Sequence, residues 1–222
     1  YGYETQNISD LENDLQIAMN FGCRHVSCYQ LTIEKNTPFF KRMQSGQLRP
    51  ISEDYEVKCF NFIADFLKNF SINRYEISNY AVPGFESRHN LAYWNYEDYL
   101  GVGPSAHSRL TIDGCKTELQ KFYSIDEWLQ KISSNQSTYA VKRELSDQEQ
   151  LEETFIMGLR LTKGIDIQNI KTKFSESLLN PILDKIKFLS QQGLLQKTQQ
   201  NFIRLTEQGQ LKANSVIDFL LS

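Results

Sequence analysis

Residues 9–31, SDLENDLQIAMNFGCRHVSCYQL, contain the pattern that decides the fold of the first part of the chain. Ser9 and Glu12 have the spacing of a capping box, and Gly22 can end a helix in the left-handed conformation. Apolar residues recur on one helical face between them: Leu11, Leu15, Ala18 and Met19. The following HVSCYQL, residues 25–31, is rich in residues that favour strands. The stretch therefore predicts a helix over 9–21 and a strand over 25–31.

The alternation of helix and strand continues after a turn at residues 35–38. A second helix is predicted from about Ser52, with its apolar residues on one side: Tyr55, Cys59, Ile63, Phe66, Leu67 and Phe70. RYEIS at 74–78 then predicts another strand. Such alternation indicates a parallel α/β sheet with ligands at the C-terminal ends of its strands, where Glu34 is placed. The alternative for Glu34 is a solvated carboxylate in a turn.

The second part of the chain has a different pattern. Residues 84–109 are predicted to form a functional loop, because they are crowded with His, Asn, Tyr, Trp, Gly and Pro. Beyond Glu127 the pattern becomes helical, and a second capping box begins at Ser146. A helix ending at Gly193, a hairpin around residues 199–200 and a last helix complete a winged-helix-like unit. We expect two domains, residues 1–139 and 140–222. The helices of the second domain carry mixed charge, which does not favour DNA binding. We therefore interpret the second domain as a packing module or a lid.

Composition restricts the classes of partner. The chain has 24 Lys and Arg against 27 Asp and Glu, a net charge of -3, without a basic run, which argues against a nucleic-acid partner. No stretch of 18 or more apolar residues predicts a membrane span, and the first residues do not resemble a signal peptide. We therefore expect a soluble, cytoplasmic protein. The four cysteines are not spaced as the ligands of a metal site are, and we interpret them as isolated reduced thiols.

The three histidines differ in their neighbours. His25 begins a strand and is interpreted as a hydrogen-bonded structural residue. His89 has Tyr93 and Trp94 close behind it, so an imidazole that could bind iron lies beside flat apolar surface that could cover a porphyrin. The alternative is an aromatic anchor for the loop. His107 ends a glycine-rich run at 101–107, which indicates either close approach to an adenine or methionine moiety or a tight turn.

Several segments, in order, resemble the oxygen-independent coproporphyrinogen III oxidase-like family of radical S-adenosylmethionine proteins. YGYETQ at 1–6 resembles the family's Tyr-Gly-x-Pro-x-Gln turn, with Glu4 in place of proline and Gln6 kept. HVSCYQLTIEKNTPF at 25–39 resembles its last barrel strand and the loop after it. RYEISNYAVPGFESRHNLAYW, YLGVGPSAHS and ETFIMGLRLTKGID follow in the family's order, the last resembling the start of its C-terminal helical domain.

The resemblance implies the last part of a partial (β/α) radical SAM barrel followed by a helical, winged-helix-like domain. The sequence His-Asn-x-x-Tyr-Trp marks the heme-chaperone branch, which implies that His89, Asn90, Tyr93 and Trp94 bind heme, with His89 on the iron. The places that contact S-adenosylmethionine fall near Thr32 and His107, where the residue types differ from the family's. The resemblance also places Gln6 and Glu34 near S-adenosylmethionine or the substrate.

The family's CxxxCxxC motif, which holds a [4Fe–4S] cluster, is not among these residues, and the chain begins at Tyr1 as if cut from a longer protein. We therefore expect that this chain alone binds no cluster and performs no radical chemistry, and that an exposed barrel edge allows self-association. For the whole protein the resemblance implies a heme chaperone that passes heme to acceptor proteins. The alternatives are a true oxidase that decarboxylates coproporphyrinogen III, and a non-catalytic interaction module.

Overall fold

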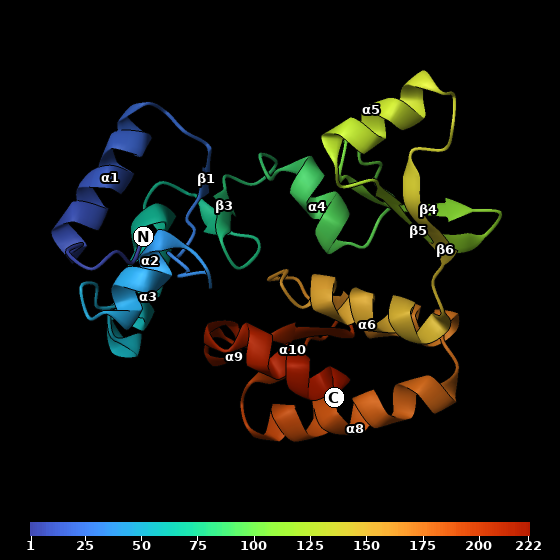
Figure 1. The fold of residues 1–222 in the computed structure, drawn as a ribbon. Coiled ribbons are helices and arrows are strands. Elements are labelled where there is room, and N and C mark those ends of the chain that lie inside the picture. Colours follow the sequence, from blue (N-terminus) through green and yellow to red (C-terminus); the bar gives the residue numbers. More distant parts are fainter. The chain divides into compact units, whose positions relative to one another are not determined.

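The computed structural model describes all 222 residues and divides them into two compact units, residues 1–87 and 88–222 (Figure 1). The architecture is mixed α/β, with short antiparallel sheets in both units. The expected domain boundary at residue 140 falls within the second unit, in a strand. The division into 1–139 and 140–222 therefore stays a prediction about domains, distinct from the division into compact units.

The first unit consists of helices joined to a small three-stranded sheet. Its elements are α1 (Ile8–Asn20), β1 (His25–Ser27), α2 (Pro38–Gln44), α3 (Glu53–Lys68), β2 (Asn73–Arg74) and β3 (Asn79–Ala81). Its core lies between α1 and α3 and is built from the periodic apolar residues: Leu11, Leu15, Cys59, Ile63, Leu67, Ile72 and Tyr80. The helices expected over 9–21 and from Ser52 are thus confirmed.

The beginning of α1 differs from the prediction in its cap. The helix starts at Ile8, and Asn7 and Asp10 form the capping box, each side chain accepting from the other's backbone N–H. The expected pair of Ser9 and Glu12 lies two residues further along the chain. Asparagine caps a helix as well as serine does, so the helix begins after Asn7 and is longer at its N-terminus than predicted. Gly22 follows the helix with φ of 71°, as predicted.

The sheet of the first unit corrects the prediction of a parallel sheet. Its order is β1-β3-β2, and β3 pairs antiparallel with both neighbours. The reason lies in residues 75–78, which form a turn where a strand was expected. Tyr75 N–H donates to the Asn79 carbonyl, and Ser78 N–H donates to the Glu76 carboxylate. This turn folds the chain directly back, so β2 and β3 form a hairpin without the crossover that parallel strands require.

A buried polar chain connects this turn to β1. Glu76 and Asn79 are each only 2% exposed. Ser27 donates to the Asn79 side-chain oxygen, and the Asn79 amide donates to the Glu76 carboxylate. Buried polar groups are stabilising only when they are hydrogen-bonded, which these contacts achieve. Strand β1 also ends at Ser27, so the strand expected over 25–31 is shorter than predicted.

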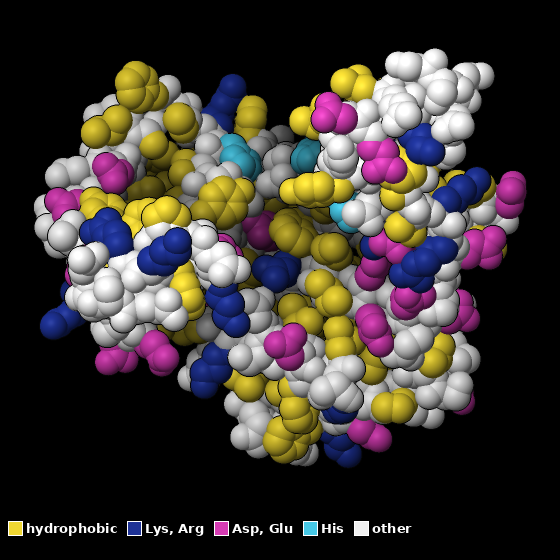
Figure 2. Space-filling view, in the orientation of Figure 1, with side chains coloured by type: hydrophobic (Ala, Val, Ile, Leu, Met, Phe, Trp, Pro, Cys, Tyr) yellow, Lys and Arg dark blue, Asp and Glu magenta, His cyan; other side chains and the backbone are white.

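Large apolar side chains remain exposed on the first unit, and Figure 2 shows hydrophobic side chains gathered in the left part of the view. Phe21 is 83% exposed, Tyr29 62% and Ile17 55%. Exposed apolar patches commonly mark interaction surfaces. Self-association through this unit stays a prediction.

The second unit opens with a helix and a sheet that the sequence did not predict. Its first elements are α4 (Arg88–Trp94), β4 (His107–Ile112), β5 (Cys115–Lys121), α5 (Ile125–Ser133) and β6 (Tyr139–Glu144). The sheet has the order β4-β5-β6, and both pairs are antiparallel. Strand β5 reads CKTELQK and is mostly polar, yet Lys116, Thr117 and Leu119 are buried. Polar residues on a buried strand conceal the alternation on which strand prediction depends.

The remaining elements follow the predicted order more closely. They are α6 (Asp147–Gly158), β7 (Ile165–Asp166), α7 (Ile167–Lys173), α8 (Glu176–Gln191), β8 (Leu195–Lys197), β9 (Phe202–Leu205), α9 (Glu207–Leu211) and α10 (Ala213–Leu221). The capping box of Ser146 and Glu149 is present, and β8 and β9 form the expected hairpin. Strand β7 adds to this hairpin to give the order β7-β9-β8. None of the helices is both long and apolar enough to cross a membrane.

Candidate functional site

The sequence His-Asn-x-x-Tyr-Trp lies on helix α4, so the expectation of a loop over residues 84–109 is wrong for this part. Between Phe85 and Leu100 there is no proline or glycine, and Leu91 and Ala92 are good helix formers. The loop expectation overlooked this local propensity. On a helix, residues four apart share a face, which brings His89 and Tyr93 together.

An aromatic face joins α4 to the chain that follows it. The ring centroids of His89 and Tyr93 are 4.7 Å apart in an edge-to-face contact, and those of Tyr93 and Tyr99 are 4.3 Å apart. His89 is exposed, whereas both tyrosines are half-buried. Burial, opposed by the Arg109 charge, raises the pKa of the Tyr99 hydroxyl. The face thus presents an accessible imidazole beside uncharged aromatic rings.

Trp94, by contrast, belongs to a different environment from His89. It lines a cavity of about 310 Å³ together with residues of α6 and α7. The Arg160 guanidinium lies 5.6 Å from its ring centroid, and Arg160 also donates to the Asn214 side chain. The ring therefore anchors α4 to the helices after it. For Trp94, these contacts support the alternative of an aromatic anchor.

The glycine-rich run at 101–107 approaches its own chain closely. A side chain on Gly101 would lie 2.3 Å from the His107 carbonyl oxygen, and Gly101 N–H donates to Ser108 Oγ at 2.9 Å. Glycine is required at this position by the backbone that packs against it. This favours a tight turn over a cradle for a ligand. His107 is exposed at the start of β4.

The first unit contains a cavity of about 580 Å³, and one of the predicted residues, Thr32, lines it. Gly2 lines it too, and its N–H donates to the buried Gln6 side chain at 2.7 Å. Gln6 therefore shapes the wall of the cavity. Glu34 is not among the lining residues, and its carbonyl accepts from the Thr37 hydroxyl in the turn before α2. This contact fits the alternative of a turn residue for Glu34.

His25 and the cysteines have structural surroundings. His25 Nε2 lies 3.0 Å from the Tyr75 hydroxyl, which agrees with a hydrogen-bonded structural histidine. Cys59 is buried, and burial raises the pKa of the half-buried Cys28 thiol to about 11. No group of three or more His, Cys, Asp or Glu side chains is placed to hold a metal ion. The expectation that this chain binds no cluster stays a prediction.

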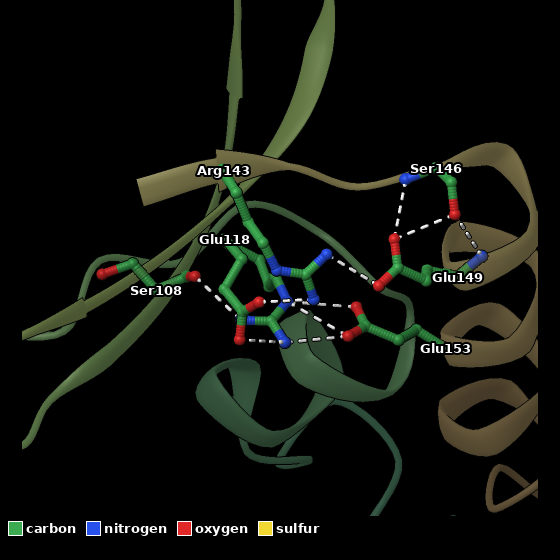
Figure 3. A network of polar contacts seen from close by, with 7 residues as sticks. Ser108, Glu118, Arg143, Ser146, Glu149 and Glu153 are labelled. Carbon is green, nitrogen blue, oxygen red and sulfur yellow. Dashed lines mark hydrogen bonds and ion pairs between the residues drawn. The ribbon is translucent and has the colours of Figure 1, made fainter. Parts of the chain in front are cut away.

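A network of charged residues, largely missed at the level of sequence, holds helix α6 against the sheet. Arg109 Nη2 on β4 lies 2.8 Å from Glu153 Oε1 and 3.4 Å from Glu118 Oε1. Arg143 on β6 lies 2.7 Å from both Glu118 and Glu149, as Figure 3 shows. Only Glu149 had a sequence signal, its capping box. The others could not be found, because their partners are far apart in the chain.

The network shifts the acidity of its carboxylates. The Ser146 N–H, then the Arg143 guanidinium, lower the pKa of Glu149 to about 2. Burial raises the pKa of Glu153, but the hydrogen bonds and charge of Arg109 outweigh it, so this pKa lies below its ordinary value. Burial and the neighbouring Glu153 raise the pKa of the Tyr96 hydroxyl. Both carboxylates are therefore held in the charged form.

Known proteins match the chain in both sequence and fold. Residues 145–211 match the family model described as the HemN C-terminal domain. The chain is 31% identical over 221 residues to the heme chaperone HemW of Bacillus subtilis (strain 168), covering 100% of this chain and 57% of that protein. It is 30% identical to the heme chaperone HemW of Lactococcus lactis subsp. lactis (strain IL1403), again over 100% and 57%.

The chain is similar over its whole length to HemW proteins and corresponds to the C-terminal part of HemN-like radical SAM proteins. Its HemW homologues extend over its whole length, and it spans somewhat more than half the length of these curated relatives. Among solved structures, coproporphyrinogen III oxidase (HemN) from Escherichia coli, a radical SAM enzyme, matches with a TM-score of 0.73. The two are 16% identical, and the match covers 100% of this chain and 53% of that chain. The chain therefore has the fold of the C-terminal portion of HemN.

Proposed function

We propose that the chain is part of a HemW-like heme chaperone and that His89 binds the iron of heme before the heme passes to an acceptor protein. The observation that carries the proposal is the exposed His89 ring in edge-to-face contact with Tyr93. Unlike His25, His89 has no hydrogen bond to either ring nitrogen. A free lone pair beside aromatic surface is what iron ligation in a porphyrin site needs.

The apolar surface around His89 also supports heme as the cargo. Tyr93 contacts the imidazole edge to face, and Tyr99 packs against Tyr93 with its ring tilted by 46°. Leu100 and Val102, which follow Tyr99 in the chain, are 61% and 86% exposed. Asn90 follows His89 on α4, and we propose that it belongs to the same heme site. Relatives named heme chaperones match the whole chain, which supports heme over another planar ligand.

We also propose that the first unit is the last part of a radical SAM barrel and that residues from about 140 form a winged-helix-like domain. The fold shared with HemN and the hairpin of β8 and β9 support this reading. In the whole protein, S-adenosylmethionine or the substrate would then lie at the cavity lined by Thr32, with Gln6 shaping its wall. A [4Fe–4S] cluster would be held by residues outside this chain.

Heme titration of the chain tests the role of His89. Wild type should shift the Soret band with saturation, and His89→Ala should weaken binding of ferric heme by at least about tenfold, or 1.4 kcal/mol. His107→Ala is the matched control, because His107 is an exposed histidine of the same unit. Binding should also weaken as falling pH protonates histidine, since protonation removes the lone pair.

Iron-free porphyrin separates iron ligation from apolar binding. Its affinity should be the same for wild type and His89→Ala, because it offers no iron to the imidazole. A His89→Ala protein that keeps the wild-type heme spectrum and affinity contradicts the proposal. The oxidase alternative predicts instead that the whole protein, with cluster and S-adenosylmethionine, consumes coproporphyrinogen III. Capture of protein partners by residues 140–222 with no effect of heme supports the interaction-module alternative.

A further inference from the structure

The chain that follows α4 is held in a conformation that its side chains do not favour. Tyr96 has φ of 56°, in the left-handed region, at the position after the helix where glycine is common. Its N–H donates to the Tyr93 carbonyl at 2.9 Å, and the Glu97 N–H donates to the Ala92 carbonyl at 2.9 Å. A large residue with a β-carbon keeps this backbone only where its surroundings hold it, so the contacts of Tyr96 need an explanation.

Lys116 on β5 supplies those contacts. It is only 8% exposed, and its Nζ donates to the Tyr96 carbonyl at 3.1 Å and to Asp98 Oδ1 at 2.8 Å. The same ammonium lies 4.5 Å from the centroid of the Tyr96 ring. A buried ammonium must be paired, and the partners of this one all lie within residues 96–98. Asp98 also accepts from the N–H and the hydroxyl of Thr111 on β4, at 2.6 and 2.9 Å, so the segment is tied to two strands of the sheet.

This segment leads to Tyr99, which belongs to the aromatic face. The backbone N–H and carbonyl of Tyr99 pair with those of Arg109 on β4, at 2.8 and 3.1 Å. The Tyr99 ring packs against Tyr93, whose ring in turn contacts His89. Residues 95–98 connect α4 to Tyr99, so their conformation determines whether the Tyr99 ring meets the helix.

We propose that Lys116 and Tyr96 are positioning residues for the aromatic face of His89. By holding Tyr96 in its left-handed conformation, Lys116 places the Tyr99 ring against the helix. The inference rests on the proposed heme site and names the residues that shape its apolar surface. Loss of Lys116 should therefore weaken the binding of heme and of iron-free porphyrin alike, whereas loss of His89 should weaken the binding of heme alone.

Hydrogen exchange of the 222-residue chain, without any ligand, tests the positioning itself. Lys116→Met keeps the aliphatic stem without the charge, and should speed exchange of the hydrogen-bonded N–H groups of residues 95–99 by about tenfold or more, as read by NMR. Exchange in α8 should stay at its wild-type rate. Lys142→Met is the matched control, because Lys142 is an exposed lysine of the same sheet. Unchanged exchange at residues 95–99 overturns the proposal, and so does equally faster exchange in α8, which would mean that Lys116 only stabilises the whole unit.

Porphyrin titration tests the consequence for the site. In Lys116→Met the dissociation constants of heme and of iron-free porphyrin should both rise about tenfold, while the Soret maximum of the saturated heme complex stays unchanged because His89 remains. Asp98→Asn, a change at an exposed residue that the fold should tolerate, should act in the same direction by a smaller factor. Weaker heme binding with unchanged binding of iron-free porphyrin overturns the proposal, as do wild-type affinities for both. If the wild-type protein binds neither, the proposed function fails, and the exchange rates alone decide the positioning role.

Discussion

The core of the first unit and the charged network of the second hold their helices by different interactions. In the first unit, α1 and α3 meet through periodic apolar residues such as Leu15 and Ile63. In the second, Arg109 and Arg143 of the sheet reach carboxylates on α6. Apolar burial is strong and insensitive to pH, whereas half-buried ion pairs are weaker and titrate. The two units should therefore respond differently to truncation, charge removal and acid.

The largest effect is expected in the apolar core. Ile63 is 0% exposed, so Ile63→Ala should lower the free energy of unfolding of the first unit by about 2–5 kcal/mol, through lost burial and the cavity left behind. Hydrogen exchange read by mass spectrometry should show faster exchange in α1 and α3. Ile17→Ala is the control, because Ile17 is 55% exposed on α1 and its loss should cost within about 0.5 kcal/mol. Equal losses in the two variants would mean that α1 and α3 do not share this core.

A smaller effect is expected from the network. Arg109→Met keeps the aliphatic stem but leaves Glu153 without its cation, which should cost about 1–3 kcal/mol. Tryptophan fluorescence reports this unit specifically, because both tryptophans lie in it. A double-mutant cycle with Glu153→Gln should show coupling between the two residues, while Lys142→Gln on the exposed side of β6 should change little. Additive losses would show that the pair contributes no interaction energy.

The smallest effect is a change in acid sensitivity. The pKa of Glu149 is about 2 in the fold against 4.5 for an ordinary glutamate, so its stabilising contribution is complete above about pH 5 and is lost as pH falls toward 2. Glu149→Gln should therefore flatten the dependence of the urea midpoint on pH across this window. The matched control is Glu152→Gln on the same helix, whose carboxylate accepts from the neutral Gln148 side chain. If the pH dependence of the urea midpoint were the same in Glu149→Gln as in wild type, Glu149 would not be the source of this acid sensitivity.

The sequence predicted the parts of the fold that rest on periodicity and local capping. Helices α1, α3, α6 and α8 and the hairpin of β8 and β9 each have a continuous local signal. The sheet of β4, β5 and β6 has none, because Lys116 and Thr117 are polar yet buried. The antiparallel order of the first sheet was also missed, since it depends on hydrogen bonds of Glu76 in a turn that reads as a strand.

The candidate site was predicted in part. The order of motifs pointed to His89 and Tyr93, and the structure brings these two together on one face. The order of motifs did not indicate that Trp94 lines a separate cavity, because that depends on how α4 packs on α6. The network of Arg109 could not be predicted either, since its partners come from segments distant in sequence.

The shortness of α4 has a consequence for any ligand of His89. A seven-residue helix is not stable alone in water, since nucleation costs more than so few hydrogen bonds return. Its helical state depends on packing of the Trp94 ring against the rest of the unit. His89 and Tyr93 are neighbours only while that state persists, so the apparent dissociation constant at His89 equals the intrinsic one divided by the helical population. The packing of the Trp94 ring and the ligand affinity of the His89 imidazole therefore depend on the same conformational equilibrium.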